Sequence, residues 1–385
     1  FILSKGIDGV EKVAKIGMPM LIMFGIFLAI RAITLKSGTD GALFDGVVGL
    51  NYLWTPDFTS LSNPNVWLAA AGQIFFTLSV GMGTVHCYAS YLNSKDDVAL
   101  NAMSAGWMNE FVEVVVGASI VIPITVGYFG VDGMLEIAKQ PQGSFALGFK
   151  TMPYLFAQWG PILAPIAGVM FFGLLFFAGI TSSLAMGTPW MGFMHDEFGW
   201  SRKMGAWSFG LFVLIIGLPT VFFYNYGVFD EYDEWAGTNS LFVFALAETI
   251  LFAWIFGYKK GWEEIKLGAD FKVPEFFKYV IGFVTPTLLV IVFLANIIKP
   301  IGNDWGAAFA NLFTDGWILD DSSLIKKITM SGLRTEIAQA TDVTQLEFLK
   351  KKFNYTLLAR GILVLSFTLI AYLVYRASKL RKKTF

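Results

Sequence analysis

Residues 65–91 read NVWLAAAGQIFFTLSVGMGTVHCYASY, a strongly apolar segment that Gly81 and Gly83 interrupt midway. A helix in lipid keeps its backbone hydrogen bonds internal, so a break at mid-depth is tolerated only where protein, water or a ligand satisfies the freed groups. The stretch is therefore a candidate binding site. The alternative is an ordinary helix that contains glycines, because glycine is more frequent in membrane helices than in soluble ones.

The composition is that of a polytopic membrane protein. Of the 385 residues, 55% are hydrophobic and 15% are charged, and the mean hydropathy of +0.61 is higher than that of an ordinary soluble protein. The net charge of −1 argues against nucleic acid as a partner. The single cysteine, Cys87, excludes an internal disulfide, and two histidines leave little for a zinc or haem site.

Eight stretches meet or approach the roughly 20 apolar residues that a spanning helix needs. Basic residues concentrate at both ends and in the short connections that would share one side, so we expect both termini in the cytoplasm. On the other side, residues 36–64 and 129–160 predict loops, the second with helical pieces near 131–139 and 151–159 and a lid-like role. The stretches are 16–35, 66–91 with its break, 98–128, 161–194, 204–224, 235–257, 279–298 and 356–375.

Polar side chains inside the predicted spans are candidate functional residues, because each is costly at membrane depth unless it is paired or hydrated. Asn109 and Glu113 are four residues apart and share a helical face. A later span carries Thr181 and Ser182, and the sixth carries Glu248. The alternative for the hydroxyls is a hydrogen bond to their own helix.

These oxygen-bearing faces fit a hard alkali cation, which prefers oxygen to sulfur or imidazole. Carbonyls at the end of a half-helix can hold a cation, and the amides that open the next half-helix favour an anionic group. The residues by themselves therefore indicate a transporter or channel for a small polar or charged solute.

Several separated motifs resemble the neurotransmitter:sodium symporter family, especially its bacterial amino-acid transporters. They are GQIFFTLSVGMG at 72–83, Asn109-Glu110, FFAGITSS at 176–183, DEYDEWAGT at 230–238 and LNYLWTPDF from residue 50. The resemblance covers about residues 5–298 and, more loosely, the last span. It implies an all-α polytopic membrane protein with the leucine-transporter-like inverted-repeat fold.

The eight spans resemble helices five to twelve of a twelve-helix protein, so the resemblance implies a C-terminal portion that lacks the first four helices. Residues 1–298 would be part of the transporter core and resemble helices five to eleven, with the broken helix at 65–91. Residues 299–353 would be an extramembrane insertion, and 354–385 the last helix with a basic cytoplasmic tail. Because half of the paired broken helices would be missing, we expect no transport by these 385 residues alone.

The resemblance also assigns two sodium sites. Thr77 and Asn109 would supply side-chain oxygens to the first sodium ion. Ala178 would supply its carbonyl to the second, and Thr181 and Ser182 their hydroxyls.

The implied substrate residues lie on two spans. The carbonyls of Phe76 and Thr77, with Ser79, would face the substrate amine, and the Phe76 ring would cap the pocket. Met82 and Met186 stand where the family's leucine transporter has an aromatic and a branched aliphatic residue. Methionine is flexible and polarizable, so either an adaptable apolar pocket or ordinary core packing explains them.

Three further carboxylates have counterparts in the family. Glu113 stands where chloride-independent members carry a carboxylate, which implies no chloride requirement. Asp233 matches an outer gate and Asp196 an inner gate, although both could simply be solvated carboxylates at helix ends.

The resemblance thus implies sodium-coupled symport of a small hydrophobic amino acid by alternating access, in the plasma or inner membrane of a prokaryote. Sodium would be the only cofactor. The amino acid and the lipid bilayer would be partners, with a homodimer as the candidate assembly. The alternative is a shortened, non-transporting membrane protein of the same fold that acts as a channel or scaffold. An intramembrane enzyme is disfavoured, because no HExxH or GxSxG motif occurs.

Overall fold

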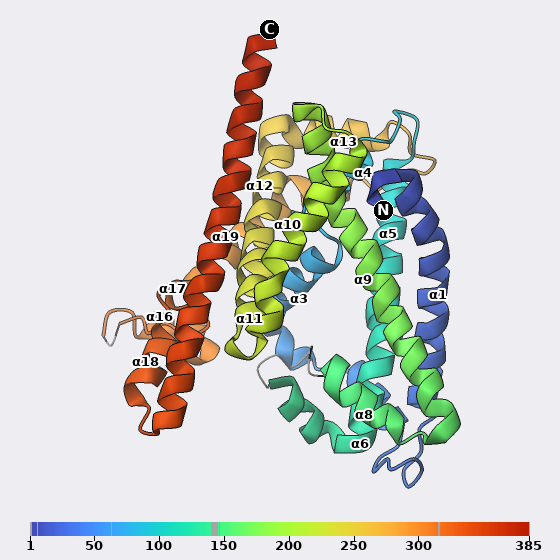
Figure 1. Ribbon diagram of the computed structural model, residues 1–385, viewed down its shortest axis with the longest axis vertical. Helices are drawn as coiled ribbons and strands as arrows, with labels where there is room; N and C mark the ends of the chain where they lie inside the picture. The colour runs from blue at the N-terminus through green and yellow to red at the C-terminus, as the bar shows by residue number, and fades with distance from the viewer. Residues whose placement is uncertain are drawn as a thin grey trace. The chain divides into compact units, whose positions relative to one another are not determined.

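The computed structural model describes residues 2–384 apart from 6, 63, 140–144, 146 and 315, and the described residues are mostly helical (Figure 1). The chain divides into two compact units. The first contains Phe1–Thr59 and Asn101–Trp207, and the second contains Ser60–Leu100 and Ser208–Phe385.

Within the described residues, seven helices are long and apolar enough to cross a membrane. Each overlaps one of the stretches predicted from hydropathy over most of its length. The eighth predicted stretch, 66–91, forms two shorter helices, as the interruption by glycines indicated. The seven are Asp8–Ile33, Val98–Ile137, Gly160–Phe198, Arg202–Phe222, Val228–Lys266, Phe276–Ile297 and Val343–Arg381.

The first unit is built on α1, which contacts both α6 and α9, around a core that includes Leu28, Ile124 and Phe156. A π-helical segment, η3, joins α5 to α6. The elements are η1 (Leu3–Lys5), α1 (Ile7–Ile33), α2 (Gly46–Trp54), α5 (Val98–Glu110), η3 (Phe111–Gly117), α6 (Ala118–Lys139), η4 (Leu147–Thr151), α8 (Met152–Ala157) and α9 (Gly160–Phe198).

The region predicted as a loop, 36–64, contains the helix α2, so that prediction was incomplete. The helix forms because the apolar run VVGLNYLW packs against α6 and α1. Gly49 permits the close approach, since an added Cβ would lie 2.6 Å from the Cα of Pro123. The second predicted loop starts where expected: Gly130 interrupts α6 with φ of 71° and ψ of 175°.

In the second unit, α3 packs against α12, and α12 packs against α15. The elements are η2 (Phe58–Ser62), α3 (Pro64–Thr77), α4 (Thr84–Ala89), α10 (Arg202–Phe222), η5 (Tyr224–Tyr226), α11 (Val228–Tyr232), η6 (Asp233–Ser240), α12 (Leu241–Ile250), η7 (Leu251–Gly257), α13 (Tyr258–Lys266), α14 (Phe276–Tyr279), η8 (Val280–Val284), α15 (Thr285–Ile297), η9 (Ile301–Asn303), α16 (Trp305–Ala310), α17 (Leu324–Thr329), α18 (Ser331–Gln339) and α19 (Val343–Thr384).

The start of α5 belongs to this second unit, where Ala99 packs with Trp262 and Val273 in a small buried cluster. The region between the last two spans contains α16, α17 and α18, and an antiparallel bridge between Pro300 and Leu319 closes the segment that holds α16. The helix α19 is continuous from Val343, so the boundary predicted at residues 353 and 354 falls inside it. It is the long red helix that passes α11 in Figure 1.

Candidate functional site

The break between α3 and α4 contains three residues with left-handed backbone conformation. They are Ser79, with φ of 55°, Gly81, with φ of 84°, and Gly83, with φ of 73°. Glycine adopts this conformation readily, whereas a serine there is strained. The helical pattern ends as the N–H of Ser79 donates to the Phe76 carbonyl at 3.1 Å. The glycine prediction is therefore confirmed: this is a true interruption, not a helix that merely contains glycines.

A carboxylate from α12 holds the broken segment. The backbone N–H of Gly81 donates to Oε2 of Glu248 at 3.1 Å, and Nδ1 of His86 lies 3.6 Å from Oε1 of the same residue. Glu248 thus satisfies an amide that the break releases from the helix, as a membrane environment requires. The sequence marked Glu248 as a costly intramembrane carboxylate, but gave no indication of its partners.

Gly81 also lies against the backbone of α12. An added Cβ would stand 2.5 Å from the Leu241 carbonyl oxygen and 2.8 Å from the Ala245 nitrogen. Two constraints therefore favour glycine at position 81: its positive φ and the close approach of the α12 backbone.

The predicted substrate residues of the second unit cluster along this break. Phe76 is half-exposed, at 50%, and Thr77 is the last residue of α3. Thr77, Ser79 and Met82 are partly buried. These four residues therefore fall within a stretch of seven positions. The backbone between them does not continue the hydrogen-bond pattern of a helix.

In the first unit, the Asn109–Glu113 pair forms as its spacing predicts. The amide nitrogen of Asn109 donates to Oε2 of Glu113 at a long 3.5 Å, and both side chains are partly buried. Glu113 lies in the π-helical segment η3. The contact orients the amide, so that the carbonyl oxygen Oδ1 of Asn109 is the atom suited to a cation.

The predicted residues of the second sodium site lie on one turn of α9. The Thr181 hydroxyl donates to the carbonyls of Phe177 at 2.8 Å and Ala178 at 3.1 Å. The structure therefore shows the alternative considered for the hydroxyls, in which Thr181 bonds to carbonyls of its own helix. Because the hydroxyl is the donor in these bonds, its oxygen lone pairs remain able to bind a cation. Ser182 is exposed, and Met186, one turn further on, is 49% exposed.

The two predicted gate residues are exposed carboxylates. Asp233 opens the π-helical segment η6, and Asp196 lies two residues before the end of α9. Ion pairs flank Asp233: Glu234 accepts from Lys327 at 2.7 Å, and Glu231 accepts from Arg360 at 2.8 Å.

Sequence reasoning missed Arg360, which connects three elements of the second unit. Besides Glu231, it donates to the backbone carbonyls of Lys327 and Ile328 at the end of α17, and its guanidinium lies 5.0 Å from the Trp235 ring. The available signal was an arginine within the apolar run 356–375, because such a charge requires a partner.

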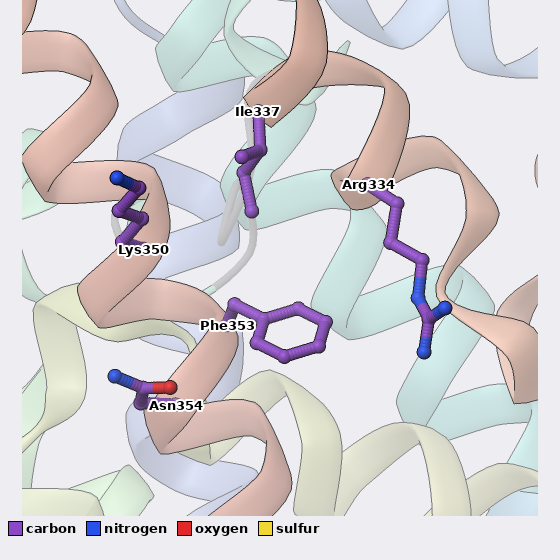
Figure 2. A pocket seen from close by; sticks show the side chains of 5 residues that line it. All are labelled: Arg334, Ile337, Lys350, Phe353 and Asn354. Atoms are coloured by element: carbon purple, nitrogen blue, oxygen red, sulfur yellow. The ribbon is translucent and has the colours of Figure 1, made fainter.

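Two pockets lie near the last span, and in neither do several polar side chains point toward one ligand position. One, of about 290 Å³, is lined by the already paired groups around Arg360. The other, of about 520 Å³, lies between α18 and α19. Figure 2 shows that the Phe353 ring occupies its centre and that the Arg334 and Lys350 side chains extend to opposite sides, so the two cations do not meet at one anion.

Among the described residues, no group of three or more His, Cys, Asp or Glu side chains could hold a metal ion. This does not bear on sodium, for which the candidate ligands are hydroxyl, amide and carbonyl oxygens.

Comparison with known proteins places the chain in a family. The model of the sodium:neurotransmitter symporter family matches residues 1–330. An uncharacterised sodium-dependent transporter of Methanocaldococcus jannaschii is 30% identical over 337 residues, which are 87% of this chain and 66% of the relative. A sodium-dependent nutrient amino acid transporter of Drosophila melanogaster is 24% identical over 283 residues, or 73% of this chain and 42% of the relative.

Among solved structures, the crystal structure of MhsT in complex with L-phenylalanine superposes with a TM-score of 0.63 and 27% identity, over 76% of this chain and 64% of that one. The chain spans about two thirds of the length of the archaeal relative and less than half of the insect one. The motifs of the sequence, the broken helix and the match over residues 1–330 agree: the chain belongs to the sodium:neurotransmitter symporter family, whose members are transporters and not enzymes.

Proposed function

We propose that this protein carries out sodium-coupled symport of a small hydrophobic amino acid by alternating access. The observation that carries the proposal is the interruption between α3 and α4, which Glu248 holds open in a chain of a sodium symporter family. Sodium entry supplies the energy, since inward movement of one elementary charge is worth about 2.3 kcal/mol per 100 mV of membrane potential. The concentration gradient adds to that term.

The sodium ligands are proposed residue by residue. In the second unit, Thr77 ligates sodium through its hydroxyl at the end of α3. In the first unit, Asn109 does so through its amide oxygen, and α9 contributes Ala178, Thr181 and Ser182. The resemblance of their motifs to the family supports these roles, as does the closeness of Ala178, Thr181 and Ser182 along α9.

Glu113 supports independence from chloride. Its carboxylate lies beside Asn109 and so provides a fixed negative charge near a proposed sodium ligand. A second anion there would be repelled rather than required.

The substrate class follows from Phe76, Ser79, Met82 and Met186. Two methionines and an aromatic ring favour an apolar side chain of adaptable shape, while Ser79 and the backbone at the break suit the charged amine. The relatives support an amino acid: one is named a nutrient amino acid transporter, and MhsT was crystallised with L-phenylalanine. Asp233 and Asp196 are proposed as the outer and inner gate acids, in a membrane protein whose described ends face the cytoplasm and which assembles as a homodimer.

The decisive experiment is thermal stabilisation of the complete gene product by a panel of amino acids, with sodium and with potassium in its place. A ligand at one hundred times its dissociation constant stabilises the folded state by about 2.7 kcal/mol. We expect hydrophobic amino acids to raise the melting temperature only with sodium present. Replacement of chloride by gluconate should leave the shift unchanged.

Two results would contradict the proposal. If no amino acid stabilises the protein in a sodium-dependent manner, the substrate class is wrong. If stabilisation needs chloride as well, the role proposed for Glu113 is wrong; if that role is right, the variant Glu113→Gln should make the stabilisation depend on chloride.

A further inference from the structure

The segment that follows α15 forms a hairpin anchored to the end of that spanning helix. We call the described residues 299–314 and 316–319 the aromatic hairpin. Pro300 and Leu319 form an antiparallel bridge at its base, and the N–H of Ile301 donates to the Ile318 carbonyl at 2.9 Å. The indole of Trp317 donates to the Ile298 carbonyl at 2.7 Å. The hairpin is thus fixed within one turn of the place where α15 leaves its membrane-spanning stretch.

The far part of the hairpin exposes large apolar side chains. Trp305, Phe309 and Trp317 cluster, with ring centroids 5.3 to 6.5 Å apart. Phe313 is 94% exposed and Phe309 62% exposed. No charged residue occurs from position 305 to 313. An exposed aromatic patch of this kind is unfavourable in water and marks a contact surface.

The patch follows an apolar strip on the last turns of the spanning helix that contains α15. Ile291, Leu294 and Ile298 are exposed and spaced by three and four residues, so they form one face of the last turns of α15. Ile301 and Ile318, which come next in the hairpin and are bonded to one another through their backbones, are both more than half exposed as well. Since α15 lies in the spanning helix Phe276–Ile297, the same medium should cover both.

A hydrogen-bonded polar cluster lies at the base of the hairpin. Asp320, which directly follows the hairpin, accepts hydrogen bonds from the backbone N–H and hydroxyl of Ser322 and from the N–H of Gly302, while Lys299 donates to the Ser322 hydroxyl at 2.8 Å. The tip is aromatic and mostly apolar, with the exposed Asn311 and Thr314 on either side of Leu312 and Phe313. Amphipathic segments with Trp and Phe on the apolar side favour the membrane interface.

We propose that the aromatic hairpin is an interfacial anchor, whose tip, formed by Phe309, Leu312 and Phe313, inserts among the phospholipids on the side of the membrane where α15 ends. The occupant of this apolar surface is the bilayer itself. The anchor would fix the depth of α15 and of the base of α19 in the membrane, a role independent of which solute is transported.

Spin labels test the position of the tip. Phe313→Cys, and separately Phe309→Cys, would be labelled in a background with Cys87→Ser and reconstituted in nanodiscs of phosphatidylethanolamine and phosphatidylglycerol. Collision with oxygen, which partitions into lipid, is compared with collision with a water-soluble nickel chelate. Gln339→Cys on α18, an exposed polar position, is the aqueous reference, and Leu365→Cys on α19, 71% exposed in the apolar run, is the lipid reference.

We expect the oxygen-to-nickel collision ratio at residues 313 and 309 to exceed that at 339 several-fold and to approach the ratio at 365. Ratios equal to that at 339 would overturn the proposal, because the tip would then lie in water. Low collision rates with both reagents would overturn it as well, because another protein surface, such as a second copy of the chain, would cover the tip.

Discussion

The broken pair α3–α4 and the uninterrupted helix α9 present polar groups at membrane depth in opposite ways. The first interrupts its backbone pairing and relies on Glu248 to satisfy a released amide. The second retains its helix over 39 residues and offers hydroxyls, such as Thr181, that also bond to its own carbonyls. The proposed site therefore uses an interrupted backbone at the break, whereas α9 contributes hydroxyls and the Ala178 carbonyl from a helix that stays continuous.

This comparison predicts that the break is far more sensitive to substitution than α9. Gly81→Ala should have the largest effect, because a left-handed alanine costs about 1–2 kcal/mol and its Cβ would also clash with the Leu241 carbonyl. We expect a strongly lowered yield of folded protein and no transport.

The matched control is Gly168→Ala in α9, where an added Cβ meets no atom within 4 Å. Its melting temperature should equal or slightly exceed that of the wild type. Similar losses in the two variants, measured by size-exclusion yield and thermal melting, would contradict the distinction between the helices.

Removal of the carboxylate that holds the break should have the next largest effect. Glu248→Ala leaves the Gly81 amide without its acceptor, and a hydrogen bond to a charged group contributes about 1.5–3 kcal/mol. Glu248→Gln keeps an acceptor oxygen, so its loss of stability should be smaller. Thermal melting of the two variants checks this order, and an equally stable Glu248→Ala would show that the contact does not hold the break.

On α9, loss of a hydroxyl should change sodium affinity rather than folding. Thr181→Val should leave the melting temperature nearly unchanged, because a hydroxyl bonded to its own helix adds little stability. We expect about a tenfold weaker apparent sodium affinity, equivalent to about 1.4 kcal/mol. Ser183→Ala is the control, since its hydroxyl bonds to the Gly179 carbonyl in the same way and is not a proposed ligand. If the two variants have equal apparent sodium affinities, Thr181 is not a sodium ligand.

A second carboxylate that accepts backbone N–H groups, Asp97, should have the smallest effect because it lies in water. It accepts from Leu100 at 2.8 Å and from Asp270 at 2.7 Å, and these bonds hold the pKa of Asp97 below its ordinary value. A lowered pKa stabilises the fold above the ordinary pKa of about 3.9 and loses that contribution as the pH falls through the lowered value.

Asp97→Asn should therefore lower the melting temperature slightly at neutral pH. The difference from the wild type should shrink below about pH 4. A difference that persists in acid would mean that the charge of Asp97 is not what anchors the start of α5.

Much of the fold could be predicted from the sequence, and the exceptions have physical causes. Hydropathy located all the spans because lipid sets their minimum length. The helix α2 was missed because its nine residues carry a weak local signal and are stabilised by packing through Gly49 against Pro123. The Asn109–Glu113 contact was predictable because it is local in the helix, whereas the bond of Arg360 to Glu231 joins residues 129 apart in the chain.

The sequence by itself determined the membrane class, the family and the interruption at Gly81 and Gly83, because composition, motifs and backbone preference are properties of neighbouring residues. Only the tertiary structure decided what makes the interruption tolerable. Gly81 and Glu248 are 167 residues apart, and no periodicity connects them; the packing of α3 against α12 brings the freed amide to the carboxylate. A released backbone group in lipid requires a partner, but the folded chain selects which one.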